Sequence, residues 1–436
     1  MTDYNKELIS FLDKSPTAFH AVVNIKARLE AEGYTELVES VKWELSEGGK
    51  YFVVRNDSSI IAFRTPSFDF TGFMISAAHS DSPAFKVKEN PEIVENGYVK
   101  INVEGYGGML MAPWLDRPLS VAGRIIVKNG NKYEVRLVNV DRDLLLIPNV
   151  AIHMNRDANK NQSWNAQVDM LPILGSADET KGTFMRIVAE VAEVNEDEII
   201  SHDLFVYARD KGKVWGGSDE YISSPHLDDL QCVYGCLEGF LGANNSSSVP
   251  VLAVFDNEET GSLTKQGADS TFLEDVLKRI SLASGKDEEG HYRAVSSSFM
   301  VSADNAHAVH PNHPEKADPI NRPMINKGIV IKFNAAQHYT TDAVSCAVYR
   351  DLCESNDIPV QVFTNRSDTR GGSTLGNVSN AHVSLNTVDI GLAQLAMHSC
   401  YETVGARDTK HLVDAMTVFY SKTFRVDAGG SFELLD

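Results

Sequence analysis

The chain has 436 residues, of which 43% are hydrophobic, and a formal net charge of −20 at pH 7. This length exceeds one ordinary hydrophobic core, so we expect two domains or one large domain with an insertion. The acidic balance argues against nucleic acid and anionic membrane surfaces as partners, because both need a basic face. The sequence contains no apolar run of the roughly 18 residues that a membrane-spanning helix needs.

Two features indicate a cytoplasmic protein. The N-terminal segment 1–13 is too charged, and its apolar run too short, for a signal peptide. The cysteines form an odd set without Cys-x-x-Cys spacing, so we expect reduced and mostly buried thiols. They are Cys232, Cys236, Cys346, Cys353 and Cys400.

The first 88 residues predict a helix followed by three strands. Ser15 as the N-cap and Pro16 at the first helical position predict a helix that ends near Gly33. Apolar runs bounded by polar turns predict strands over 51–55, 60–64 and 72–78.

The third of these strands leads into His79-Ser80-Asp81. His79 is a suitable zinc ligand, and Asp81 would hold the other ring nitrogen and fix the tautomer. So short a pattern leaves an ordinary loop histidine as the alternative.

Residues 89–223 show a pattern of short strands and turns. Asn129-Gly130 between two strand-like runs predicts a β-hairpin. Gly105, Gly107 and Gly108 indicate bends or close approach of backbone. We therefore expect a mostly β insertion over 89–223, between two segments, 1–88 and 224–436, of one α/β domain.

An α/β pattern returns with a helix that begins at Leu227 and places Asp228 in its first turn. A carboxylate there either complements the helix dipole or ligates a metal. Later helices are expected over 270–283, 343–352 and 412–424, with a flexible acidic stretch at 285–290.

The segment 249–255 predicts a strand buried on both faces, as in the middle of a parallel sheet. Glu258 and Glu259 follow where the strand ends, which is where ligands bind in open α/β sheets. Adjacent carboxylates are costly to bury unpaired, and a cation relieves that cost. One would then ligate a metal and the other would act as a base on water, whereas two solvated loop carboxylates are the alternative.

Three further strands end on or carry polar residues. The run 298–303 ends on Asp304, and the run 390–397 leads to His398. Lys332 lies within the apolar run 328–333, either reaching water from an edge strand or directed into a pocket.

No local spacing connects these residues, so a zinc-finger-like site is excluded. A mostly parallel central sheet flanked by helices would bring them to one edge. Two His, two Asp and one Glu suit two zinc ions about 3.5–4 Å apart. The six candidate ligands or bases are His79, Asp228, Glu258, Glu259, Asp304 and His398.

Essentially the whole chain resembles the aspartyl aminopeptidase family of dizinc metallopeptidases, in its bacterial form. The resemblance implies a zinc-peptidase-like α/β fold whose β-rich insertion mediates oligomerisation. The segments that carry it are 77–83, 152–153, 227–228, 257–262, 302–312, 327–332 and 394–399.

The resemblance implies a role for each matching residue. One zinc ion would be held by His79, Asp228 and Asp304. A second would be held by Asp228, which bridges, together with Glu259 and His398. Asp229 stands where many relatives are expected to carry Asn, and we leave it out of the site.

It also implies catalytic and substrate-binding residues. Glu258 would be the general base, and Asp81 the partner of His79. His307, Lys332 and Tyr339 would line the substrate pocket, and His153 would reach into the active site of a neighbouring subunit.

The implied activity is that of an aminopeptidase that removes N-terminal Asp or Glu from short peptides with metal-activated water, in a homo-oligomer, typically a dodecamer. One alternative keeps the dizinc chemistry but prefers neutral residues such as Leu. A second is a non-catalytic assembly protein on this fold, which would need the ligands but not Glu258, Lys332 or Tyr339.

Overall fold

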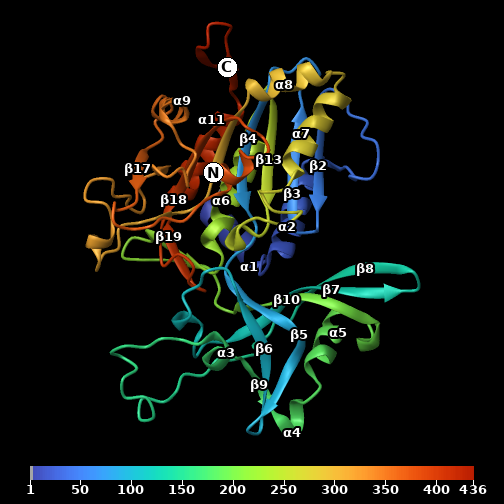
Figure 1. The fold of residues 1–436 in the computed structure, drawn as a ribbon, viewed down its shortest axis with the longest axis vertical. Helices are drawn as coiled ribbons and strands as arrows, with labels where there is room; N and C mark the ends of the chain where they lie inside the picture. The colour runs from blue at the N-terminus through green and yellow to red at the C-terminus, as the bar shows by residue number, and fades with distance from the viewer. Residues whose placement is uncertain (1–2) are drawn as a thin grey trace.

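The structure, a computed structural model, describes residues 3–436. It contains a large mixed sheet with helices on both faces and a smaller sheet at the other end of the molecule (Figure 1). Met1 and Thr2, the start of the segment judged against a signal peptide, lie outside the described residues. Within residues 3–436, no helix combines the length and the apolar character needed to span a membrane.

The large sheet has thirteen strands. They are β1 (Thr35–Glu36), β2 (Gly49–Arg55), β3 (Ser59–Thr65), β4 (Phe73–His79), β11 (Lys213–Trp215), β12 (Tyr221–Ser224), β13 (Val249–Phe255), β14 (Phe299–Ala303), β15 (Ala306–His307), β16 (Ile329–Phe333), β17 (Val360–Thr364), β18 (Asn386–Leu395) and β19 (Glu402–Gly405). At the centre, β13, β4, β14 and β18 lie side by side and run parallel. Antiparallel neighbours flank this core, β3 on one side and β16 and β19 on the other. The predicted α/β fold is confirmed, with more antiparallel pairing than expected.

Helices cover both faces of the large sheet. They are α1 (Tyr4–Asp13), α2 (Ala18–Ala31), α6 (Leu227–Gly242), α7 (Phe272–Ala283), α8 (Glu288–Ser296), α9 (Ala343–Glu354), α10 (Leu375–Ser379) and α11 (Asp408–Tyr420). Every residue of β4 and β13 is buried. Leu252 and Val254 pack into the core on the side of α6 and α11, and Val251 and Ala253 into the core on the side of α7. This two-sided burial explains the continuous apolar runs.

The smaller sheet has six strands in the order β8-β7-β10-β5-β6-β9. Their bounds are β5 (Ala84–Glu95), β6 (Tyr98–Tyr106), β7 (Leu119–Asn129), β8 (Lys132–Asn139), β9 (Ile173–Ser176) and β10 (Ile199–Ala208). The short helices are α3 (Ala166–Asp169), α4 (Ala177–Thr180) and α5 (Phe184–Ala192). The predicted hairpin at Asn129-Gly130 is confirmed, because Asn129 pairs with Lys132 across a two-residue turn.

The boundaries of the two sheets along the chain differ from the expected boundaries of the insertion, 89–223. The smaller sheet already begins at Ala84, whereas β11 and β12 return to the large sheet through β19. The division of the chain into domains at 88/89 and 223/224 stays a prediction. The separate mostly β sheet that it anticipated is present.

Three helix predictions need correction. The second helix begins at Ala18 rather than Pro16, because the Ser15 hydroxyl donates to the Phe11 carbonyl at 2.7 Å at the end of the unexpected helix α1. The acidic stretch 285–290 is not wholly a loop, since Asp287 caps α8 by accepting from Gly290 N at 2.8 Å. The last helix ends at Tyr420, and Phe424 lies in β20 (Thr423–Val426), which pairs with β21 (Phe432–Leu435).

The five cysteines are all buried and none forms a disulfide. This confirms the reduced, buried thiols that their spacing predicted. Burial raises the pKa of Cys236 to about 12, which keeps this thiol protonated at neutral pH.

Candidate metal centre

The carboxyl ends of the four parallel strands at the centre of the large sheet lie at the same edge, and each strand ends on or is followed by a candidate ligand. His79 is the last residue of β4, and Asp304 follows β14 directly. Glu258 and Glu259 form the short helix η3 (Glu258–Thr260) after β13. His398 follows β18 after a short turn. The topology therefore gathers residues that lie far apart in the sequence.

Asp228 reaches this edge from the start of α6. Its φ of −83° and ψ of 106° are not helical, so it does not lie in a regular first turn as expected. Its backbone N–H donates to Glu402 Oε2 at 2.9 Å, and its side chain is buried. This leaves both carboxylate oxygens of Asp228 available to the neighbouring histidines.

Asp228 lies between two imidazoles. His79 Nε2 is 3.5 Å from Asp228 Oδ1, and His398 Nε2 is 3.6 Å from Asp228 Oδ2. Glu259 Oε2 is 3.5 Å from His398 Nε2. Ligand atoms within 4.8 Å of one another form three groups: one joins His79, Glu258 and Glu259, and the other two share Asp228. Of these two, one consists of His79, Asp228, Asp229 and Asp304, and the other of Asp228, Glu259 and His398.

Three buried carboxylate oxygens in these groups have no hydrogen-bond partner. They are Asp228 Oδ1, Asp229 Oδ1 and Glu259 Oε1. Leaving such atoms unpaired in the interior is costly, and a cation supplies the missing partner. Nitrogen and oxygen donors in groups of three or four suit zinc. The donor set therefore fits the predicted metal.

Both histidines are held through Nδ1, which leaves Nε2 toward the carboxylates. His79 Nδ1 lies 3.1 Å from the Asp81 carbonyl oxygen and 3.4 Å from Asp81 Oδ1. His398 Nδ1 lies 2.5 Å from the Gly108 carbonyl oxygen. A ring nitrogen that donates to an oxygen fixes the tautomer and frees the other nitrogen to bind a metal.

A cavity of about 120 Å³ opens beside these groups, lined by the candidate ligands and by His307, Lys332 and Tyr339. Lys332 is 2% exposed, and β16 is paired on both sides, so the edge-strand alternative is excluded. Its Nζ lies 3.5 Å from Asp304 Oδ1 and donates to the Asn305 carbonyl at 3.2 Å. The ammonium group is thus directed to the cavity and already engaged there.

Comparison with known proteins gives a match to the family model "Aminopeptidase I zinc metalloprotease (M18)" over residues 11–420. The chain belongs to the M18 family of zinc aminopeptidases. The family resemblance predicted from the sequence is thereby confirmed, as is a metal-dependent aminopeptidase activity.

Relatives and solved structures of M18 proteins cover nearly the whole chain. A probable M18 family aminopeptidase 2 from Clostridium acetobutylicum is 49% identical over 96% of this chain and 99% of its own. A cryo-EM structure of the Ape4 and Nbr1 complex matches with a TM-score of 0.93 and 33% identity, over 96% of this chain and 85% of that one. The S. cerevisiae mApe1 dodecamer matches with a TM-score of 0.83 and 28% identity, over 96% of each chain.

In this M18 aminopeptidase, the crowding of carboxylates shifts their pKa values. Burial, reinforced by Asp304 and Asp81 and opposed by His79, raises the pKa of Glu258 to about 8. Burial and Asp228 raise the pKa of Glu259 well above its ordinary range. Without a metal ion, burial therefore favours the protonated forms of Glu258 and Glu259, and a bound cation would replace these protons.

The free energy of unfolding of the zinc-free protein is expected to fall as the pH rises from 6 to 8. The Glu258 pKa of about 8, against an ordinary value of 4.5, means that the folded state keeps a proton that the unfolded state has released. Stability then falls through this window by roughly 2–3 kcal/mol for each such buried carboxyl group. Thermal unfolding with and without zinc checks this, and zinc should raise Tm more at pH 8 than at pH 6. An equal rise at both pH values would contradict it.

The structure does not bring His153 to the centre. It is exposed on the segment between β8 and α3, and it does not line the cavity. The other ten residues expected at the site lie together: nine line the cavity, and Asp81 contacts His79 behind it.

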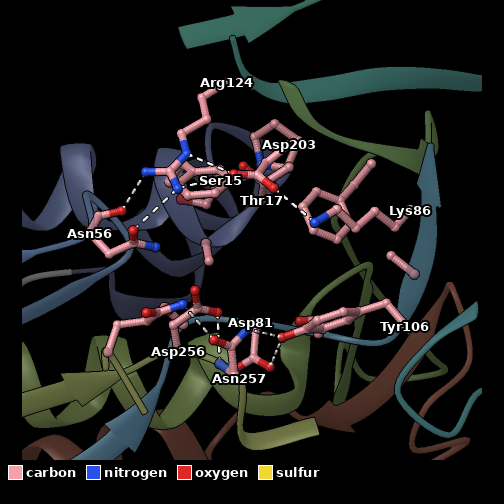
Figure 2. A pocket seen from close by; sticks show the side chains of 18 of the residues that line it. Ser15, Thr17, Asn56, Asp81, Lys86, Tyr106, Arg124, Asp203, Asp256 and Asn257 are labelled. Carbon is pink, nitrogen blue, oxygen red and sulfur yellow. Dashed lines mark hydrogen bonds and ion pairs between the residues drawn. The ribbon is translucent and has the colours of Figure 1, made fainter. Parts of the chain in front are cut away.

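Sequence reasoning missed the residues that hold the candidate ligands in place. Glu402 accepts from Asp228 N at 2.9 Å and from His398 N at 2.8 Å, and so connects two segments that carry candidate ligands. Tyr106 donates from its hydroxyl to Asp81 Oδ2 at 2.7 Å, as Figure 2 shows. No local pattern marks Glu402, whereas the glycines around Tyr106 were the one available signal.

Proposed function

We propose that this M18 aminopeptidase uses two zinc ions to hydrolyse the first peptide bond of short peptides, with a preference for N-terminal Asp or Glu. The observation that supports it most is the meeting of five candidate ligands and Glu258 around one cavity. His79, Asp228 and Asp304 would hold one ion, and Asp228, Glu259 and His398 the other. Asp228 would bridge them, since each of its oxygens faces a different imidazole.

Zinc, when bound, supplies Lewis acidity and lowers the pKa of water. Glu258 accepts the proton of the attacking water and returns it to the leaving amine. Glu258 lines the cavity and lies within 4.8 Å of candidate ligand atoms of His79 and Glu259, which is where a base must lie to reach the attacking water. Asp81 holds the His79 ring in the tautomer that leaves Nε2 free.

The acidic preference follows from charge in the pocket. In a chain with a net charge of −20, a substrate carboxylate needs a local cation, and Lys332 is the buried cation of this cavity. Burial lowers the pKa of Lys332, but Asp304, Tyr339 and Asp389 together outweigh this and raise it, so the side chain stays charged. When zinc engages Asp304, the ammonium becomes available to a substrate carboxylate. His307 and Tyr339 line the same cavity.

Replacement of Lys332 by Met is expected to lower kcat/KM for an Asp substrate about 100-fold and for a Leu substrate less than about fivefold, because only the carboxylate needs the charge. Met keeps the length of the buried stem. Parallel assays on Asp and Leu p-nitroanilides measure the ratio, and Lys327→Ala, at an exposed position of the same segment, is the control. Equal losses on both substrates would favour the alternative preference for neutral residues.

We further propose that His153 completes the active site of a neighbouring subunit in a homo-oligomer, which we take to be a dodecamer like the S. cerevisiae mApe1 structure. Val150, Ile152 and Met154 are 55%, 48% and 82% exposed, and such apolar exposure is typical of a contact surface. The cytoplasmic location stays a prediction.

Co-expression of His153→Ala and Glu258→Gln subunits tests this arrangement. Each variant alone is expected to be at least about tenfold less active, whereas the mixed oligomer should recover activity, because some sites then combine an intact His153 with an intact Glu258. Light scattering checks the assembly, and His313→Ala, an exposed histidine elsewhere, is the control. A fully active His153→Ala variant would contradict the proposal.

A further inference from the structure

The strand β6 of the smaller sheet ends directly against the metal centre. The Tyr106 hydroxyl, at its last residue, donates to Asp81 Oδ2 at 2.7 Å and accepts from Asn257 Nδ2 at 2.8 Å (Figure 2). Asp81 is 4% exposed and also accepts from the backbone N–H groups of Glu258 and Glu259, both at 3.2 Å. The hydroxyl therefore completes the donor set of the buried carboxylate that faces His79.

The direction of this hydrogen bond is fixed by its neighbours. Asn257 Oδ1 accepts from Thr264 Oγ1 at 2.8 Å and from Gln266 Nε2 at 2.7 Å, so the amide nitrogen is the group turned to Tyr106. The hydroxyl proton is then left for Asp81. Burial and the Asp81 charge raise the pKa of Tyr106, which keeps the proton on the phenol.

The next residues of the same segment contact the second group of ligands. Gly107 has a φ of +72°, and a Cβ at this position would lie 3.0 Å from the Cβ of Glu259. The Gly108 carbonyl accepts from His398 Nδ1 at 2.5 Å, and Leu110 N donates to the His398 carbonyl at 3.0 Å. A larger residue at 107 would push the chain away from both Glu259 and His398.

We propose that Tyr106-Gly107-Gly108 is a positioning segment through which the smaller sheet holds both halves of the metal centre, with Tyr106 as the positioning residue for Asp81 and His79. The inference rests on the proposed two-ion function. The Tyr106 ring is anchored in its own sheet, because it packs edge-on against Phe205 of β10 at 5.4 Å between ring centroids. Groups that orient metal ligands in this way commonly change metal affinity or activity by about 10- to 100-fold when replaced.

Tyr106→Phe tests the inference, since it keeps the ring packing and removes only the hydroxyl. We expect zinc release into a chelator to be about 10- to 100-fold faster, kcat to fall by a similar factor and KM to stay within about twofold. Zinc release is followed by atomic absorption, so this readout does not depend on activity. Tyr98→Phe, at the exposed other end of β6, is the matched control and should behave as wild type.

Gly107→Ala gives a second, independent measurement on the other half of the centre. We expect it to lower the zinc content from about two ions to about one per chain, because only Glu259 and His398 are displaced. If Tyr106→Phe releases zinc at the wild-type rate and keeps the wild-type kcat, the positioning role is overturned, whether or not the Tm is lower. The proposed function would remain intact in that case. A wild-type protein that holds no zinc would instead overturn the proposed function itself. If Tyr106→Phe does not fold, a wild-type zinc content in Gly107→Ala overturns the inference.

Discussion

Replacement of Glu258 by Gln is expected to keep the zinc content at the wild-type level and to lower kcat by about 10²- to 10⁴-fold, the usual range for loss of a general base. Gln has nearly the same shape, but its amide cannot accept the proton of the attacking water. Zinc per chain, measured by atomic absorption, and kcat on an Asp p-nitroanilide check the two parts of this expectation.

The same experiment distinguishes a metal ligand from a base at position 258. Glu258 lies within 4.8 Å of candidate ligand atoms of His79 and Glu259. The structure therefore allows Glu258 as a ligand as well as a base. Glu259→Gln is the matched comparison, since it carries the same change one residue later and should lower the zinc content. If Glu258→Gln loses zinc as Glu259→Gln does, the base has been assigned to the wrong residue.

Replacement of Asp228 by Asn is expected to weaken both ions and to lower kcat/KM by at least about 10³-fold, because metal catalysis contributes several kcal/mol. Each oxygen of this carboxylate faces a different histidine, and the Asn side chain offers only one oxygen. Zinc content and activity should therefore fall together, whereas they separate in Glu258→Gln.

Asp229→Asn provides the control for Asp228→Asn at the adjacent buried position. Burial raises the pKa of Asp229 well above its ordinary range, with Asp304 and Asp228 adding to this and His79 opposing it. Asp229 Oδ2 accepts from His79 N at 3.1 Å, and the Asn side chain keeps an oxygen that can accept this bond, so zinc should be retained. A loss of zinc as large as that of Asp228→Asn would make Asp229 a ligand, against its omission from the predicted site.

The strands that position the site were predictable because their signals are local. An apolar run buried on both faces needs no knowledge of its neighbours, and the predicted strand over 249–255 matches β13 residue for residue. The helix α1, which was not predicted, also has a local signal. Asp3 is its N-cap and accepts from Lys6 N at 3.3 Å. By contrast, whether β13 pairs parallel or antiparallel depends on strands brought together only by the fold.

The contacts that hold the candidate ligands were not predictable from one sequence. Glu402 lies 174 residues from Asp228, and nothing near either position indicates that they meet. The contact between Lys332 and Asp304 was not predicted either, because Lys332 lies in β16 and Asp304 follows β14, and only the fold brings these segments together. His153 is exposed and does not line the cavity, so the role proposed for it requires a second copy of the chain.

The most direct test of the two-ion centre is an anomalous difference map from zinc-loaded crystals, collected at the zinc absorption edge. We predict two peaks about 3.5–4 Å apart, with the Asp228 carboxylate between them. One peak should lie beside His79 and Asp304, and the other beside Glu259 and His398. A single peak, or two peaks away from Asp228, would contradict the account.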